Sequence, residues 1–150
     1  MRVLFAGTPD TAVGPLNALV DAGLDVVGVL TRQDAPLGRK RVLTPSPVAQ
    51  RAEALGLPVV KANTYDDVAH AAVADLAPDV AGVVAYGAIL PRKAIDLLPY
   101  GWINLHFSVL PQWRGAAPVQ RALMAGEREL GASTFLIEEG LDTVSYTHLR

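Results

Sequence analysis

Residues Asp79–Ala85 read DVAGVVA, a run in which consecutive positions, rather than alternate ones, are apolar. A strand with one face in water alternates apolar and polar residues, whereas a strand covered by helices on both faces is apolar throughout. The run therefore predicts a strand in a buried, mostly parallel sheet.

On both sides of this run, short β-branched stretches alternate with longer stretches rich in alanine and leucine, the pattern of βαβ units. Because βαβ crossovers are right-handed almost without exception, we expect a doubly wound open α/β sheet with ligands at the carboxyl ends of its strands. The predicted strands are Arg2–Ala6, Asp25–Leu30, Pro58–Lys61, Asp79–Ala85, Trp102–Phe107 and Ala132–Ile137. The predicted helices are Thr11–Ala22, Pro47–Leu55, Tyr65–Leu76, Pro91–Leu97 and Ala117–Ala125, with Thr64 expected to cap the third.

The composition is that of one ordinary domain: 150 residues, 51% of them apolar and 19% charged, with a formal net charge of −2. The absence of cysteine excludes a disulfide framework, a thiolate zinc site and a cysteine nucleophile. His70, His106 and His148 lie in separate segments without helical ligand spacing, so we expect no metal. No run reaches the ~20 apolar residues of a membrane helix, and the start does not resemble a signal peptide. We therefore expect a cytoplasmic protein without membrane contact.

A long polar stretch, Leu30–Pro47, is rich in proline and glycine and is predicted to be an extended loop. Compact domains seldom carry such a loop unless it has a function or is disordered. It contains four of the thirteen basic residues, with only Asp34 opposing them: Arg32, Arg39, Lys40 and Arg41. Clustered positive charge on a flexible loop suits a phosphate backbone. A solvated loop with incidental charge is the alternative, and no aromatic side chain is present there to stack on bases.

The segment Ile103–Pro111 carries the clearest sign of chemistry. In an extended strand Asn104, His106 and Ser108 share one face, because side chains alternate with a period of two. An unpaired polar group inside a core costs about 1–3 kcal/mol, so three of them at a strand end favour a cleft. An amide beside an imidazole suits a reaction that develops an oxyanion. A structural His–Asn pair remains the alternative.

Two further turns are candidates for the same region. Gly7–Asp10 follows a buried strand and opens a helix, where α/β sheets often bind phosphate. It lacks the G-x-G-x-x-G pattern, and Pro9 removes an amide donor, so Thr8 or Asp10 capping the helix is the favoured interpretation. Asp142 follows the last predicted strand; a carboxylate reaching His106 would favour the imidazolium and fix its tautomer, although an aspartate here is also a common turn residue.

Together these segments resemble the methionyl-tRNA formyltransferase family. The resemblance rests on FAGTPD at 5–10, DAPLGR at 34–39, PSPV at 45–48, VAYG at 84–87, ILP at 89–91, INLHFSVLPQWRGAAP at 103–118 and GLDT at 140–143. The N-x-H-x-S-x-L-P element is shared with the wider folate-dependent formyltransferase superfamily, whereas WRGAAP and the basic loop favour the branch that acts on tRNA. The resemblance covers about residues 1–143 and implies a Rossmann-like sheet.

The resemblance also implies an activity: transfer of a formyl group from 10-formyltetrahydrofolate, as co-substrate, to the α-amino group of initiator methionyl-tRNA, with no metal. It places the family's catalytic trio on Asn104, His106 and Asp142. It places the tetrahydrofolate-binding segment on Ser108, Val109, Leu110 and Pro111, and the pterin pocket on Tyr86, Gly87 and Leu90. It gives Arg39, Lys40 and Arg41 a role in binding the tRNA acceptor stem.

The chain departs from the family pattern at Val109, where leucine is common, and at Val144, where the family continues Asp-Thr-Gly. Valine resists the left-handed backbone that glycine allows, which puts the placement of Asp142 in question. Residues 144–150 look like a foreign junction. We therefore expect residues 1–143 to be an incomplete N-terminal catalytic domain, monomeric, without the family's C-terminal β-barrel domain, and weakly active or inactive alone.

Three other functional interpretations stay open at this stage. One is a folate-dependent formyltransferase for a small amine, such as a sugar nucleotide or glycinamide ribonucleotide. Another, of a different class, is a non-catalytic Rossmann-type nucleotide-binding domain, which would bind a nucleotide at Gly7–Asp10 and tolerate loss of His106. The third is a decayed fragment without a function of its own.

Overall fold

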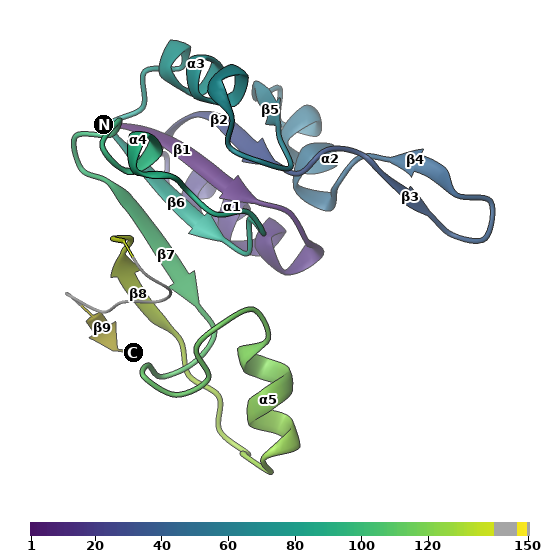
Figure 1. The fold of residues 1–150 in the computed structure, drawn as a ribbon, viewed down its shortest axis with the longest axis vertical. Helices are drawn as coiled ribbons and strands as arrows, with labels where there is room; N and C mark the ends of the chain where they lie inside the picture. The colour runs from purple at the N-terminus through teal and green to yellow at the C-terminus, as the bar shows by residue number, and fades with distance from the viewer. Residues whose placement is uncertain (140–146, 150) are drawn as a thin grey trace.

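A sheet of seven strands runs through the computed structural model of the chain, which describes residues 1–139 and 147–149 (Figure 1). Its strands are β1 (Arg2–Gly7), β2 (Asp25–Thr31), β5 (Val59–Lys61), β6 (Val80–Val84), β7 (Trp102–His106), β8 (Ser133–Leu136) and β9 (Thr147–Leu149). They lie in the order β5-β2-β1-β6-β7-β8-β9, of which the first five are parallel. The mostly parallel α/β sheet predicted from the sequence is confirmed.

Helices cover both faces of the parallel part of the sheet. One face carries α1 (Val13–Asp21), which follows the 3₁₀ turn η1 (Asp10–Ala12), and α2 (Pro47–Ala54); the other carries α3 (Asp67–Asp75) and the single turn α4 (Arg92–Ile95). Consecutive side chains of β1 therefore enter different cores: Leu4 joins the cluster that contains Trp102, and Phe5 joins the cluster that contains Leu16. Complete burial of such a side chain stabilises the fold by roughly 1.5–3 kcal/mol.

The cap of α3 differs from the prediction. The side chain of Asp66, not Thr64, accepts a hydrogen bond from the Ala69 amide at 2.9 Å. The expected cap at Thr64 is wrong because the helix begins two residues later than the sequence pattern indicates, so Asp66 occupies the position that precedes the first turn. By contrast, α2 starts where expected, with Ser46 as cap and Pro47 at the first helical position.

The segment predicted to be an extended loop contains a β-hairpin, so that prediction is wrong in part. Strands β3 (Ala35–Leu37) and β4 (Val42–Thr44) pair antiparallel and project from the body of the molecule (Figure 1). Gly38 and Arg41 turn the chain with φ of 70° and 49°, and the Arg41 amide donates to the Gly38 carbonyl at 3.1 Å. The hairpin thus presents its basic tip away from the sheet.

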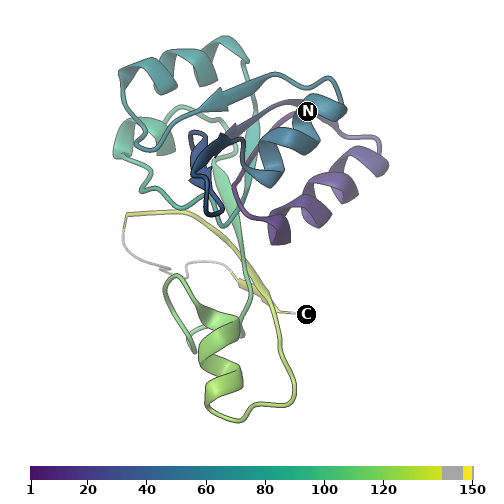
Figure 2. The same cartoon turned by 90° about the vertical axis from the view of Figure 1, so that its right-hand side faces the viewer.

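Beyond β7 the chain forms a separate lobe around helix α5 (Pro118–Met124), which Figure 2 shows next to the loops that join β7 to β8. Strand β8 returns antiparallel to β7, and β9 pairs antiparallel with β8. Residues 147–149, which lie in the stretch that departs from the family pattern, thus form the last strand of the sheet. No helix in the part of the chain that the structure describes is long and apolar enough to cross a membrane.

Candidate functional site

The carboxyl end of β7 presents the amide and imidazole that the sequence singled out. Asn104 and His106 are two residues apart in the strand, and β8 pairs them with Phe135 and Ser133. His106 is only 6% exposed, and its Nε2 lies 3.0 Å from the Trp113 carbonyl oxygen. Asn104 is half-buried, and its side chain makes no hydrogen bond with residues 1–139. Within this part of the chain, the donors of the Asn104 amide are therefore available for a ligand.

The contact with Trp113 determines which nitrogen of His106 carries hydrogen. A carbonyl oxygen only accepts hydrogen bonds, so Nε2 must be the donor. In the neutral ring Nδ1 is then the unprotonated nitrogen, and in the imidazolium it carries the second N–H. Because Nε2 is occupied, Nδ1 is the nitrogen of His106 that remains for chemistry.

The next segment, residues 108–111, is held by buried hydroxyl groups. Ser108 Oγ donates to the Gln112 carbonyl at 2.6 Å, which closes a turn. Ser133, on β8, donates to the Ser108 carbonyl at 2.7 Å and accepts from the Leu110 amide at 3.1 Å. Sequence reasoning did not identify Ser133, because a single serine in a predicted strand gives no signal. It anchors the segment that the family resemblance assigns to tetrahydrofolate.

A hollow of about 400 Å³ opens beside this segment, on the side of α5. It is lined by Phe107, Ser108, Val109, Gln112, Trp113, Ala122, Glu127, Glu129, Leu130 and Gly131. Of the predicted site residues only Ser108 and Val109 take part, whereas Asn104 and His106 do not line it. A larger hollow of about 620 Å³ lies at the opposite end of β7 and contains none of the predicted residues. We take the smaller hollow as the candidate ligand site, because ligands of such sheets bind at the carboxyl ends of the strands.

The loop after β6 differs from the expected pocket wall. Tyr86 is 2% exposed, and its hydroxyl donates to the Ala62 carbonyl at 2.9 Å within the core. Burial raises the pKa of Tyr86. Gly87 is exposed with φ of 85°, and Leu90 is half-buried against the core. The side chain of Tyr86 therefore supports this loop from beneath, while Gly87 and Leu90 retain exposed surface.

Arg32 departs from the predicted basic patch. Its guanidinium binds two neighbouring loops: Nη1 donates to the Gly87 carbonyl at 2.6 Å, and Nε donates to Asn63 Oδ1 at 3.3 Å. The prediction that Arg32 belongs to the clustered positive charge of the flexible loop is therefore wrong. Arg32 links the loops after β2, β5 and β6, a role that the sequence does not reveal.

Thr8 does not cap the following helix, contrary to expectation. Its hydroxyl donates to the Tyr86 carbonyl at 2.7 Å and accepts a hydrogen bond from the Arg32 amide at 3.4 Å. No side-chain cap is present at Pro9. The crevice between β1 and β6, where strand order reverses, is thus bridged by the protein's own hydrogen bonds. This arrangement disfavours a nucleotide at Gly7–Asp10.

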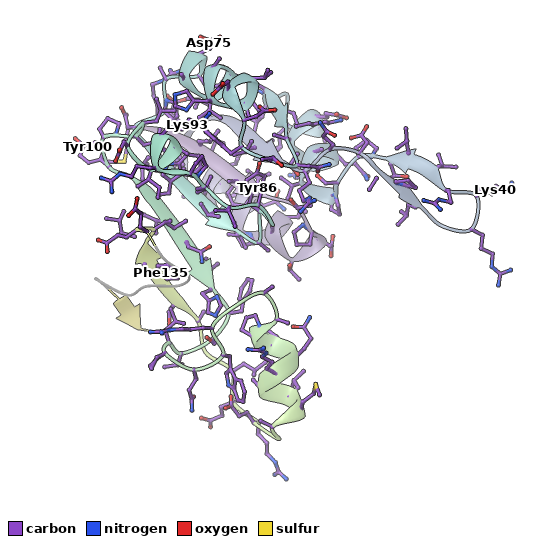
Figure 3. All side chains as sticks on the ribbon, in the orientation of Figure 1. Lys40, Asp75, Tyr86, Lys93, Tyr100 and Phe135 are labelled. Carbon is purple, nitrogen blue, oxygen red and sulfur yellow. The ribbon has the colours of Figure 1, made fainter. Side chains whose placement is uncertain are left out.

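The other three loop cations, Arg39, Lys40 and Arg41, are exposed at the hairpin tip, and Figure 3 shows Lys40 at its far end. The carboxylate of Asp34 lies 2.8 Å from Lys61 Nζ at the base of the hairpin, so Asp34 is paired away from the tip. Apolar side chains are exposed beside the cations, at Leu37, Val42 and Leu43. The tip is therefore a basic surface with apolar flanks.

Asp142 lies outside the described residues, as does the side chain of His148. His70 is half-buried, and its Nδ1 lies 3.4 Å from the Tyr65 hydroxyl oxygen. Within the described part of the chain, no three His, Asp or Glu side chains gather as metal ligands would.

Comparison with known proteins identifies the class to which this arrangement belongs. Residues 1–146 match the Formyl transferase family, and the chain belongs to that family. The curated relatives that match the chain carry a more specific name than the family does. A methionyl-tRNA formyltransferase from Arthrobacter sp. is 66% identical over 143 residues, and one from Streptomyces coelicolor is 57% identical over 145 residues. Each match covers 95% of this chain and 47% of the relative, so the chain spans about half the length of these curated relatives.

Solved structures share the fold at lower identity. Phosphoribosylglycinamide formyltransferase from Bacillus halodurans superposes with a TM-score of 0.78 at 16% identity, over 100% of this chain and 79% of that chain. A formyltetrahydrofolate deformylase from Pseudomonas syringae gives a TM-score of 0.71 at 21% identity, over 99% and 50% of the two chains. At these identities the likeness establishes the Rossmann-like fold alone.

Proposed function

We propose that the protein containing this chain transfers the formyl group of 10-formyltetrahydrofolate to the α-amino group of initiator methionyl-tRNA. The identity of 66% to a methionyl-tRNA formyltransferase supports the acceptor. The observation that carries the chemistry is the pair at the end of β7. Among residues 1–139, the half-buried Asn104 has no side-chain partner, and the buried His106 has a partner on Nε2 but none on Nδ1. The reaction belongs to protein synthesis, so we expect a cytoplasmic enzyme.

The proposed reaction is an acyl transfer without a covalent enzyme intermediate. The neutral amino group, whose ordinary pKa is about 8, attacks the formyl carbon, and a new C–N bond forms as the carbonyl oxygen becomes an oxyanion. The Asn104 amide and the Nδ1–H of protonated His106 donate hydrogen bonds to that oxygen. The oxyanion then collapses and the bond to folate N10 breaks. The attacking amine loses one proton, and N10 takes one up.

Asp142 completes this proposal, as the carboxylate that sustains the imidazolium. It and the oxyanion cannot both bond Nδ1 of His106 directly while Nε2 is held by Trp113. We therefore assign Asp142 to the proton leaving the amine, through water, with electrostatic support for His106.

Other parts of the chain would bind the two substrates. Residues 108–111, with Gly87 and Leu90, would receive the folate. The tip residues Arg39, Lys40 and Arg41 would contact phosphates of the acceptor stem, which positions a nucleic acid without reading its sequence. On this proposal residues 1–143 belong to the catalytic domain, and the half of the relatives that this chain does not match also contributes to activity.

The test uses a chimera, in which the matched part of this chain replaces its counterpart in the Arthrobacter relative. Formyl transfer is measured to methionyl-tRNA, to glycinamide ribonucleotide and to an amino sugar nucleotide. We expect transfer to tRNA alone, with His106→Ala and Asn104→Ala each lowering kcat by roughly 10²–10³, the usual loss for one oxyanion donor. Transfer to a small amine instead, or full activity of His106→Ala, would overturn the proposal. The isolated chain is assayed in parallel, with weak or no activity expected.

A further inference from the structure

The hydrogen bond that fixes His106 comes from an unusual piece of backbone. Trp113, whose carbonyl accepts from His106 Nε2, has φ of 58°, a left-handed conformation that a bulky residue rarely adopts. Such a conformation persists only where surrounding contacts over-determine it.

The side chain of Trp113 is held by a carboxylate. Its indole Nε1 donates to Glu127 Oε1 at 3.0 Å, and Glu127, which follows α5, is half-buried. Both residues line the hollow of about 400 Å³. On the neighbouring residue, the Arg114 carbonyl accepts from Arg121 Nη1 of α5 at 3.1 Å. Arg121 of helix α5 and Glu127 beyond it therefore hold the two residues that follow the turn at 108–112.

We propose that Glu127 is a positioning residue for His106. By binding the indole, Glu127 keeps Trp113 in its left-handed conformation, and the Trp113 carbonyl then keeps hydrogen on Nε2 and turns Nδ1 toward the reacting oxygen. The path is Glu127 Oε1 to Trp113 Nε1, then Trp113 carbonyl to His106 Nε2, with both hydrogen bonds at 3.0 Å. The role of these two hydrogen bonds in catalysis rests on the proposed function of His106. Their effect on the His106 tautomer does not.

The chain length suits a direct test by nuclear magnetic resonance, since the protein is 15.9 kDa. The ¹⁵N shifts of a neutral histidine distinguish a protonated ring nitrogen from an unprotonated one, and the indole N–H resonance of Trp113 reports its own hydrogen bond. His106→Gln and Trp113→Phe assign the signals among three histidines and two tryptophans. No formyl transfer is needed, so failure of the proposed function leaves this test intact.

The variants distinguish the effect of the Glu127–Trp113 hydrogen bond from the effect of the size of the side chain. Glu127→Leu removes the acceptor, Glu127→Gln keeps an oxygen acceptor, and Glu129→Leu is the matched control, because Glu129 lines the same hollow but is exposed. We expect His106 in the unmodified chain to be protonated at Nε2. The two nitrogen shifts should move toward each other in Glu127→Leu, as the tautomers mix, and stay unchanged in Glu127→Gln and Glu129→Leu.

Trp113→Phe provides a second measurement if Glu127→Leu does not fold. It removes the indole donor and leaves Glu127 in place, so it should mix the tautomers in the same way. The proposal is overturned if the unmodified chain carries hydrogen on Nδ1. It is also overturned if His106 keeps its shifts in a folded Glu127→Leu or Trp113→Phe variant.

Discussion

Replacing Ser133 by alanine should damage the candidate site more than any single exposed change. Ser133 is 0% exposed and serves two backbone groups at once: it donates to the Ser108 carbonyl and accepts from the Leu110 amide. Its methyl replacement leaves both groups without a partner in a region that water does not reach. Each unpaired buried group costs about 1–3 kcal/mol, and partial relaxation brings the expected loss of unfolding free energy to about 2–4 kcal/mol.

Urea denaturation, followed by far-ultraviolet circular dichroism, measures this loss. The midpoint should fall while the slope of the transition stays the same, because the surface exposed on unfolding hardly changes. Thr134→Ala is the matched control, since Thr134 neighbours Ser133 on β8 but makes no side-chain hydrogen bond with the residues described. Equal midpoints for the two variants would refute the claim that Ser133 anchors residues 108–111. If the anchor matters for the ligand, Ser133→Ala should also bind tetrahydrofolate more weakly than Thr134→Ala.

Three further predictions concern the core, the pH response and the hairpin. A Cβ at Gly7 would lie 2.9 Å from a backbone carbonyl oxygen, so Gly7→Ala should lose up to about 3 kcal/mol in a thermal melt, whereas Gly14→Ala, facing open space, should not. Burial raises the pKa of Tyr65 to about 12. The neutral phenol therefore contributes to the free energy of unfolding below about pH 10, and this contribution is lost as the pH rises through 12. Urea midpoints from about pH 8 to 11 should therefore fall less in Tyr65→Phe. In the chimera, replacing the cations at 39–41 with alanine should lower the salt slope of tRNA binding by roughly 0.9 for each phosphate that the tip no longer neutralises, with Arg128→Ala as control.

Each of these has an outcome that contradicts it. Equal melting temperatures for the Gly7 and Gly14 variants would show that the first turn has room which the structure denies. Parallel pH curves for the unmodified chain and Tyr65→Phe would mean that the phenol titrates alike in the folded and unfolded states. An unchanged salt slope in the hairpin variant would remove the tip from the tRNA surface.

The sheet was predictable from sequence because its signal is repeated along the chain. Strand β6 is apolar at consecutive positions, and the structure shows why: Ala81 and Val83 enter one core, and Val84 enters the other. Six strands lie within one residue of their predicted bounds. The hairpin was missed because β3 and β4 have three residues each, too few for any periodicity to emerge from a polar, proline-rich segment.

The candidate site was predictable only where side chains alternate along a strand. Asn104 and His106 stand out because two polar residues at a spacing of two interrupt an apolar run. The partner of His106 is a backbone carbonyl, which every residue has, so no pattern of letters points to Trp113. Arg32 is a loop cation in the sequence, and only the fold shows that it bridges three strand ends. Tyr86 was placed on a pocket wall, yet its hydroxyl finds a carbonyl inside the core.

Titration of tetrahydrofolate into the ¹⁵N-labelled chain most directly tests whether the end of β7 is a one-carbon transfer site. We predict amide shift changes that cluster at residues 104–110 and 87–90, that NAD does not reproduce, and that Asn104→Ala and His106→Ala reduce. Changes confined to Gly7–Asp10, or an equal response to NAD, would contradict the account.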